Sequence, residues 1–220
     1  MNNRLFAIGD IHGCFDSLKE LVENKIQLQE DDKLILLGDY IDRGDKSKEV
    51  VDFIMELQEK GFDIIPLRGN HEAMLLDAYE DEKNISRWIL NGGNETLESY
   101  EISSVKDIES KYIGFLQDLN YYYAFEDYLF VHAGFNDNVL NPFTDYYSML
   151  WRCNESYTNP LLSDKTIVHG HNTVSVSKCE ERAIHKHRVI NIDTGCVYKD
   201  GEGYGRLTAY DCNRQRILFV

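Results

Sequence analysis

Residues 34–44 read LILLGDYIDRG, an apolar run of four residues followed at once by a glycine-containing polar loop. A short apolar run that stops at glycine predicts a buried strand, so Asp39 would lie just past the carboxyl end of that strand. The same arrangement occurs upstream in residues 4–10, RLFAIGD, and downstream in residues 64–71, IIPLRGNH. Three strands that each end in glycine and a polar side chain predict a sheet with those side chains gathered along one edge.

Between these apolar runs, apolar residues recur at the spacing of an α-helix. Apolar residues stand at positions 15, 18, 21 and 22, and again at 50, 51, 54 and 57, before Gly61 ends the second pattern. Strands that alternate with helices indicate parallel strands joined by crossover helices. Residues 72–120 are predicted to be mostly helical, and six short strands are predicted beyond them: 121–125, 128–131, 166–168, 189–192, 207–210 and 217–220. We therefore expect one α/β domain over residues 1–220, with a mixed sheet or two sheets.

The composition narrows the class of protein. Apolar residues make up 43% of the 220 positions, enough for a sizeable core, and no apolar stretch is long enough to cross a membrane. A net charge of −15 opposes binding to nucleic-acid phosphates, so we expect neither nucleic acid nor membrane as a partner. The first residues lack the apolar core of a signal peptide, and the five cysteines are scattered and odd in number. Together these features predict a cytoplasmic protein without a disulfide framework.

Metal-ligating side chains recur beside glycine along the chain. Asp10 and His12 stand two positions apart at a strand end, so we expect both to project to the same side. Asp39 ends the neighbouring strand, and its two oxygens could bridge two ions about 3.5–4 Å apart that share one water and polarise a phosphoryl group. Mixed aspartate and histidine ligands suit Mn²⁺, Fe²⁺ or Zn²⁺. Further oxygen and nitrogen ligands would come from Asn70, His132 and His171.

Hydrolysis of a phosphate ester also needs a proton for the leaving oxygen. His71 follows a proposed ligand without being needed as one, and Asp42 lies three positions past Asp39. A carboxylate that accepts a hydrogen bond from the imidazole would fix its tautomer and raise its pKa, which suits a general acid. Arg43, in the same loop, is the first candidate for binding the phosphoryl oxygens, because its guanidinium can donate two hydrogen bonds at once.

Taken together, these motifs resemble those of the phosphoprotein phosphatase (PPP) family of calcineurin-like metallophosphoesterases. Their order and the chain length are most similar to the small bacterial and bacteriophage-lambda-type serine/threonine phosphatases, over residues 9 to about 195. The resemblance implies a fold of two mixed β-sheets packed as a sandwich and flanked by helices, with two metal ions at one edge. The matching segments are GDIHG at 9–13, GDYIDRG at 38–44, LRGNHE at 67–72, HAG at 132–134 and GHNT at 170–173.

The resemblance also implies roles for individual residues. One metal ion would be held by Asp10, His12 and Asp39. The second ion would be held by Asp39, Asn70, His132 and His171. The general acid would be His71, with Asp42 as its partner. The phosphate would be contacted by Arg43, Asn70 and Arg152.

Three further segments complete the comparison with the family. Trp151-Arg152 resembles a segment of bacterial members that supplies a second phosphate-binding arginine, and residues 88–100 resemble the bacterial protein-phosphatase branch. Residues 192–195 resemble a late family segment whose role is mainly structural. His169 is an alternative ligand to His171, because two residues that are two positions apart in a strand face the same way.

The resemblance implies a Mn²⁺-dependent phosphomonoesterase, with Fe or Zn as alternative metals, whose partner is a phosphorylated protein or peptide. It would hydrolyse phosphoserine and phosphothreonine, and also phosphotyrosine, by direct attack of a metal-bound hydroxide. The enzymatic alternative is a symmetrical dinucleoside-tetraphosphate hydrolase, which needs a base- and ribose-binding surface that the sequence does not reveal. A metal-binding regulatory protein without catalysis is a third hypothesis, and the complete set of catalytic groups argues against it.

Overall fold

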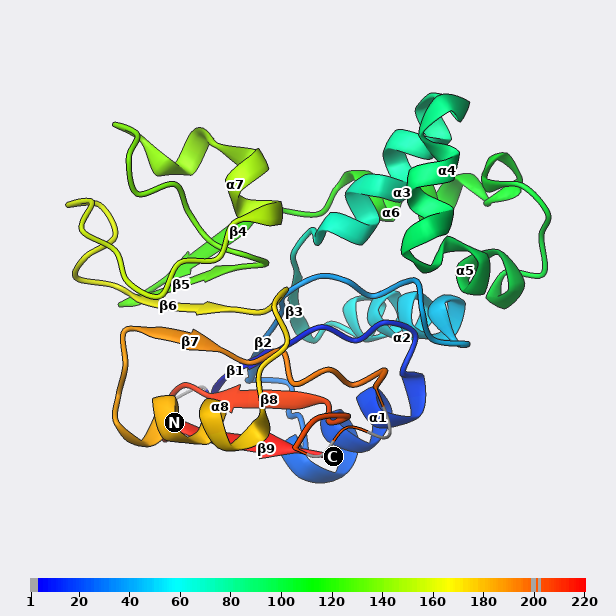
Figure 1. Ribbon diagram of the computed structural model, residues 1–220. Coiled ribbons are helices and arrows are strands. Elements are labelled where there is room, and N and C mark those ends of the chain that lie inside the picture. The colour runs from blue at the N-terminus through cyan, green and yellow to red at the C-terminus, as the bar shows by residue number, and fades with distance from the viewer. Residues whose placement is uncertain (1–3, 199–200, 202) are drawn as a thin grey trace.

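The computed structural model describes residues 4–198, 201 and 203–220, and its strands form two sheets (Figure 1). The first sheet has the strand order β3-β2-β1-β8-β9. Its parallel strands are β1 (Leu5–Ile8), β2 (Lys33–Leu36) and β3 (Asp63–Pro66). Two antiparallel strands, β8 (Thr208–Asp211) and β9 (Arg216–Phe219), extend it beyond β1. The first and last strands of the chain therefore belong to one sheet.

The second sheet has the strand order β4-β5-β6-β7. β4 (Tyr122–Phe125) and β5 (Tyr128–Val131) form an antiparallel hairpin. β6 (Thr166–His169) and β7 (Val189–Asn191) add to β5 in parallel. Each described strand lies within one residue of the bounds that its apolar run predicts.

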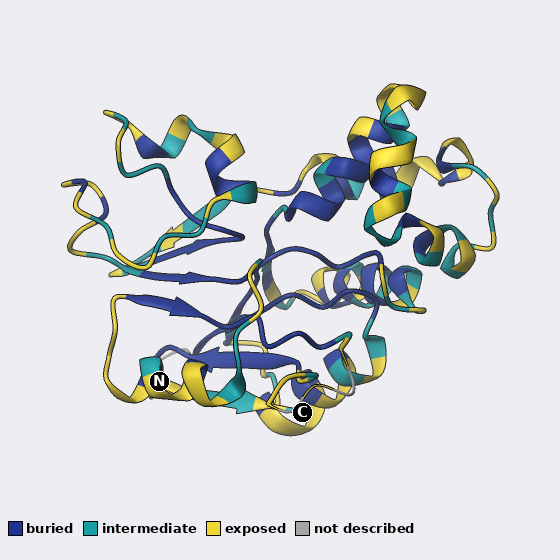
Figure 2. Cartoon of the chain, viewed as in Figure 1, coloured by how far each residue is buried: buried dark blue, intermediate teal, exposed yellow. Residues whose placement is uncertain are grey.

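The two sheets pack face to face because their strands bury side chains on both sides. In β2, Ile35 belongs to the core between the sheets, whereas Leu34 belongs to the core under the helices on the other face. Phe130 and Val168 of the second sheet share the core of Ile35, and Leu129 lies in a third core on the outer face. This alternation follows from the two-residue period of a strand. The prediction of two mixed sheets packed as a sandwich is confirmed (Figure 2).

Helices connect the strands and flank the sheets. Between β1 and β2, α1 (Phe15–Glu20) continues as the π-helical η1 (Leu21–Ile26), and α2 (Ser47–Glu59) connects β2 to β3. The predicted helical segment between β3 and β4 is confirmed as α3 (Asn70–Glu80), η2 (Glu82–Asn84), α4 (Ile85–Trp88), η3 (Ile89–Gly93), α5 (Asn94–Ser99), η4 (Val105–Asp107) and α6 (Ser110–Gln117). Later in the chain lie η5 (Pro142–Thr144), α7 (Tyr146–Trp151) and α8 (Val176–Ile184). In the part of the chain that the structure describes, every helix is too short or too polar to cross a membrane.

Candidate metal centre

The loops that follow β1, β2 and β3 are held together by backbone contacts. The N–H of His12 donates to the carbonyl of Asp39 at 2.8 Å, which joins the loop after β1 to the loop after β2. Gly38 has a φ of 103°, and a Cβ there would lie 2.4 Å from the backbone nitrogen of Gly69. Only glycine fits such a left-handed and crowded position, so the Gly-Asp pair that the sequence repeats is what lets neighbouring loops approach.

The side chain of Glu72 also holds these loops together. Its Oε2 accepts hydrogen bonds from the backbone N–H groups of Asp39 and Gly69, each at 2.9 Å, and its Oε1 accepts one from Tyr40 at 2.8 Å. The side chain is fully buried, and burial raises its pKa to about 7. A single carboxylate therefore satisfies three backbone donors and fixes the loop that carries Asp39.

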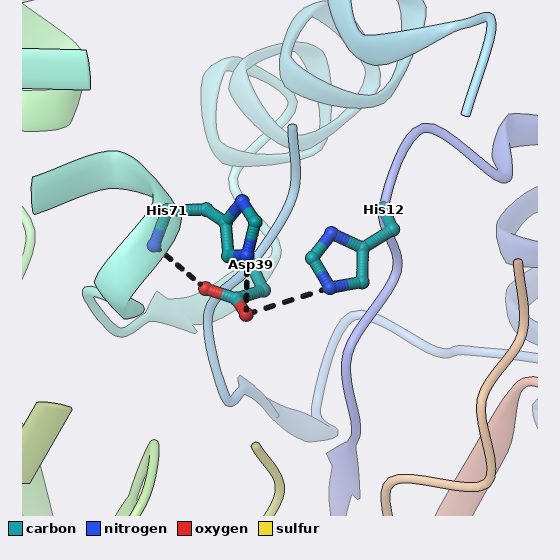
Figure 3. Close-up of side chains that lie close together, drawn as sticks. All are labelled: His12, Asp39 and His71. Carbon is teal, nitrogen blue, oxygen red and sulfur yellow. Dashed lines mark hydrogen bonds and ion pairs between the residues drawn. The ribbon is translucent and has the colours of Figure 1, made fainter. Parts of the chain in front are cut away.

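Asp39 lies at the middle of a group of histidines (Figure 3). Its Oδ2 is 3.5 Å from Nε2 of His12, 3.5 Å from Nε2 of His132 and 3.9 Å from Nε2 of His71. Its Oδ1 accepts a hydrogen bond of 3.0 Å from the backbone N–H of His71. Ring nitrogens from two loops and from the first turn of α3 thus face one carboxylate. Asp39 belongs to both clusters that could hold an ion, one with His12 and His71 and the other with His132 and His171.

The hydrogen bonds of two buried histidines, His12 and His132, define their tautomers. His12 donates from Nδ1 to the carbonyl of Ile41 at 2.9 Å, and His132 donates from Nδ1 to the carbonyl of Leu37 at 3.0 Å. Each ring therefore presents an unprotonated Nε2 to Asp39, which is the arrangement that orients histidine for a metal. Lone pairs that converge on a buried carboxylate repel one another unless a cation lies between them. The donor set therefore fits divalent metal ions.

A second group of acceptors lies beside the first. Oδ1 of Asn70 is 2.8 Å from Nε2 of His132 and 2.9 Å from Nδ1 of His171, and these two ring nitrogens are 3.1 Å apart. Asp10 completes the centre, because both of its carboxylate oxygens accept a 3.1 Å hydrogen bond from the backbone N–H of His171. The structure thus brings together all six side chains that the sequence nominates as ligands, while their ligand roles stay predictions.

The ionisation of the centre is dominated by burial. Burial raises the pKa of Asp10 well above the usual carboxyl range, and the carboxylates of Asp193 and Asp39 raise it further. Burial and then Glu72 raise the pKa of Asp39, whereas burial and then neighbouring imidazoles lower the pKa values of His12 and His132. Bound cations favour ionised carboxylates and neutral imidazoles, so they would relieve the penalty on the aspartates without protonating the histidines.

His71 and Asp42 form a buried pair next to these ligands. Nδ1 of His71 donates to Oδ2 of Asp42 at 2.7 Å, so the predicted tautomer is present and Nε2 faces the centre. The predicted rise in the pKa of His71 is wrong. Burial and then Arg43 lower that pKa to about 2, and burial raises the pKa of Asp42 to about 7. Burial wins because neither side chain is more than 1% exposed, and desolvation penalises the charged form of each.

The geometric argument that paired Asp10 with His12 is also incorrect. β1 ends at Ile8, and His12 has a φ of 46°, so the two side chains are oriented by a tight loop and not by the period of a strand. Asp39 and His171 likewise have positive φ values, 52° and 70°. Such conformations are uncommon for residues other than glycine and concentrate at functional sites. Three of the six proposed ligands are therefore oriented by left-handed backbone, which the apolar pattern did not indicate.

His169 and His171 separate at the end of β6. His171 has left the strand and faces Asn70, whereas Nδ1 of the buried His169 lies 3.1 Å from the carbonyl of Gly170 and 3.8 Å from Sγ of Cys153. The structure therefore places His171, and not His169, in the cluster with Asp39.

The two predicted arginines lie in different surroundings. Arg43 places Nη1 2.8 Å from Nε2 of His12, directly at the centre. The guanidinium of Arg152 lies 5.9 Å from the ring of Tyr147, and among the described residues none of its side-chain contacts joins it to the ligands. Its role in binding phosphate stays a prediction.

Asp193 is a residue of the centre to which the sequence analysis gave only a structural role. It is buried, it accepts hydrogen bonds from the hydroxyl of Thr173 at 3.0 Å and the N–H of Gly195 at 2.9 Å, and its charge acts on Asp10. The signal was present, since an apolar run followed by a polar side chain and glycine recurs at residues 189–195.

A cleft opens beside the centre between α3, α4 and α7. It has a volume of about 490 Å³, and aromatic rings dominate its α7 side. Tyr146 and Tyr147 are 50% and 63% exposed, and Tyr147 stacks on Trp151 with ring centroids 6.5 Å apart. Trp151 links the cleft to the centre, because its ring meets that of His171 edge to face at 6.0 Å, and the guanidinium of Arg87 lies 4.9 Å from it. No continuous motif indicates this cleft, since its residues come from separate segments.

Comparison with known proteins agrees with this geometry. The model of the calcineurin-like phosphoesterase family matches residues 4–207. Serine/threonine-protein phosphatase 1 of Salmonella typhimurium is 38% identical over 91 residues, which is 41% of this chain and 39% of that protein. An asymmetrical bis(5'-nucleosyl)-tetraphosphatase of Bacillus subtilis is 28% identical over 87% of this chain and 85% of its own length.

The remaining comparisons support the fold but do not identify the substrate. The matched stretch spans between a quarter and two fifths of the length of the first curated relatives. A protein serine/threonine phosphatase from Saccharomyces cerevisiae superposes with a TM-score of 0.70 at 16% identity, covering 100% of this chain and 79% of that chain. At such low identity the superposition shows the fold alone.

Proposed function

Because this chain belongs to the calcineurin-like phosphoesterase family, we propose that it removes phosphate from phosphoserine and phosphothreonine in proteins, and also from phosphotyrosine. The observation that carries the proposal is the pair of clusters that share Asp39, one of which includes His71 with its hydrogen bond to Asp42. The members of the family normally bind two metal ions, and the clusters here offer places for both. We propose Mn²⁺ for this mixed oxygen and nitrogen donor set, with Fe or Zn as alternatives.

The residues that would hold the ions are Asp10, His12, Asp39, Asn70, His132 and His171. Of these, His12 and His132 direct Nε2 at Asp39, and His171 shares a cluster with it. When bound, the ions would polarise the phosphoryl oxygens and activate the attacking water. Arg43 extends its guanidinium to the ring of His12, so it can donate hydrogen bonds to a phosphoryl oxygen at the same edge.

His71 supplies the proton in this proposal. Its Nδ1–H is bonded to Asp42 and burial keeps the ring neutral, so Nε2 would first take up a proton from water and then pass it to the leaving oxygen. Positioning of this kind matters most for an alkoxide, because an alkoxide is a poor leaving group without protonation.

A symmetrical dinucleoside-tetraphosphate hydrolase is the second candidate function, and the cleft favours it. The sequence showed no surface for a base, but Tyr147 and Trp151 provide stacked rings beside His171. Asp77 lines the same cleft on α3, roughly 10 Å along the helix from Asn70, and offers a carboxylate to the donors of a base. The Bacillus subtilis relative that aligns over most of this chain is an asymmetrical tetraphosphatase, so it supports the substrate class and not the symmetrical cleavage.

Initial rates on a phosphoserine peptide and on diadenosine tetraphosphate would separate the two candidates. The chain is first stripped of metal, and Mn²⁺, Fe²⁺, Zn²⁺ and Mg²⁺ are then added back one at a time. The proposal expects hydrolysis of the phosphopeptide to be restored best by Mn²⁺. Hydrolysis of the tetraphosphate alone would select the second candidate, and inactivity with every ion on both substrates would favour a protein without catalysis.

The setting of the enzyme is proposed on the sequence alone. We propose a single domain over residues 1–220 that acts in the cytoplasm on phosphorylated proteins, with no nucleic-acid or membrane partner. The net charge of −15 supports the exclusion of nucleic acid.

A further inference from the structure

Asp42 is held by more than its bond to His71. It is completely buried, and its Oδ1 accepts hydrogen bonds from the hydroxyl of Thr96 at 2.6 Å and from Nε1 of Trp88 at 3.0 Å. Its Oδ2 accepts from Nε1 of Trp88 at 3.0 Å and from the ring of His71 at 2.7 Å. The backbone N–H of Asp42 donates to Thr96 and Ser47. Trp88 and Thr96 therefore clamp the carboxylate that the imidazole contacts.

The two clamping residues come from a part of the chain that supplies no metal ligand. Trp88 ends α4 and Thr96 lies in α5, and both are 0% exposed. They are 46 and 54 positions away from Asp42 in the sequence. Trp88 also belongs to the main apolar core, and both residues lie in the segment 88–100 that resembles the bacterial protein-phosphatase branch.

Gly92 and Gly93 make this arrangement possible. Gly92 has a φ of 104°, its carbonyl accepts a 3.1 Å hydrogen bond from the backbone N–H of Arg43, and a Cβ on it would lie 2.8 Å from that nitrogen. A Cβ on Gly93 would lie 2.6 Å from the ring of Trp88. The two glycines thus let the helical insert rest directly on the loop that carries Asp42 and Arg43.

We propose that Trp88 and Thr96 are positioning residues, which orient the His71 ring through Asp42 and so govern proton transfer to the leaving oxygen. The proposal rests on the function proposed above. With the clamp in place, the Asp42 carboxylate cannot rotate and holds the imidazole in one orientation. Without the clamp, the carboxylate can rotate or accept a hydrogen bond from water instead. Proton transfer depends steeply on the position of the donor.

The test compares two esters that differ in their need for a proton. Trp88→Phe and Thr96→Val are assayed with saturating Mn²⁺ on a phosphoserine peptide, whose leaving group is an alkoxide, and on p-nitrophenyl phosphate, whose leaving group departs without protonation. We expect kcat on the peptide to fall by about tenfold or more and kcat on the aryl ester to change by less than about twofold. Thr96→Ser retains the hydroxyl and should restore the rate. Equal losses on both esters, or none, would overturn the inference.

A double-mutant cycle with His71→Asn separates positioning from general stability. If Trp88 and Thr96 act through His71, either substitution adds no further loss on the phosphoserine peptide in the His71→Asn background. Losses that multiply would show an independent structural effect and would contradict the inference. Thr96→Val is nearly isosteric, so it decides the question if Trp88→Phe fails to fold.

Tyr112→Phe is the matched control. It removes a 2.8 Å hydrogen bond from a buried ring to the carboxylate of Asp52 in the same helical core, away from the centre. Its ratio of rates on the two esters should equal that of the wild type. Wild-type protein that hydrolyses neither ester, or only the aryl ester, would overturn the proposed function and the inference with it, whereas an unchanged ratio in the clamp variants of an active enzyme overturns the inference alone.

Discussion

The metal centre and the cleft beside it are built in opposite ways. The centre takes its side chains from short loops that directly follow strands, and its buried groups are fixed by backbone hydrogen bonds. The cleft takes its side chains from the surfaces of α3, α4 and α7, where Tyr147 remains 63% exposed. In the function proposed above, the centre acts on the phosphoryl group and the cleft contacts the rest of the substrate. The difference teaches that reaction and selectivity would then reside in separate structures, so that selectivity could change without rebuilding the centre.

Asp39→Asn should break the centre and leave the cleft intact. Removing the shared carboxylate charge should lower kcat/KM on the phosphopeptide and on the tetraphosphate alike, by at least about 100-fold. Bound metal, measured by atomic absorption, should fall in parallel. Asp32→Asn is the control, because it neutralises an equally buried aspartate that pairs with Arg4. An Asp39→Asn protein that retained metal and both rates would remove Asp39 from the centre.

His71→Asn should show whether His71 acts as a general acid or as a metal ligand. The substitution leaves the six proposed ligands in place, so metal content should be unchanged, while kcat on a phosphoserine peptide should fall by about 100-fold. The loss on p-nitrophenyl phosphate should be much smaller. A parallel loss of metal would instead make His71 a ligand, for which its place near Asp39 is close enough.

Tyr147→Ala should affect the cleft alone. If a base stacks on this ring, kcat/KM on diadenosine tetraphosphate should fall about tenfold, since stacking contributes about 1–3 kcal/mol per base. The rate on the phosphopeptide should stay within about twofold. Leu140→Ala, at a fully exposed apolar residue outside the cleft, serves as control. Equal effects on both substrates would show that the cleft does not discriminate between them.

His169→Asn should change stability towards acid and leave metal content unchanged. Burial lowers the pKa of His169 from 6.5 to about 4. Below pH 6.5 the unfolded chain binds a proton that the folded chain binds only near pH 4, so the free energy of unfolding falls as the pH falls through this window. The contribution is about 3 kcal/mol at the acid end. Urea unfolding across this window should be less pH-dependent in the variant, and an unchanged slope would contradict the assignment.

Sequence patterns predicted the strands and the positions of the proposed ligands for a local reason. An apolar run followed by glycine and a polar side chain specifies both a buried strand and the place where it ends, all within a few residues. That is why Asp10, Asp39 and Asn70 could be named in advance, and why every described strand begins and ends within one residue of its prediction. Asp193 follows a related pattern, in which the run ends directly at an aspartate and glycine comes two residues later.

Other features depend on segments that meet only in the folded protein. The clamp on Asp42 joins residues 46 and 54 positions apart, and the choice between His169 and His171 depends on a left-handed residue after the end of β6. The pKa of His71 moved in the direction opposite to that predicted because burial, which the packing of the whole chain determines, outweighed one hydrogen bond. The sequence by itself thus determined the elements and the chemistry at their ends. Tertiary packing decided orientation, ionisation and the shape of the cleft, because each of these depends on distances and burial that no single segment encodes.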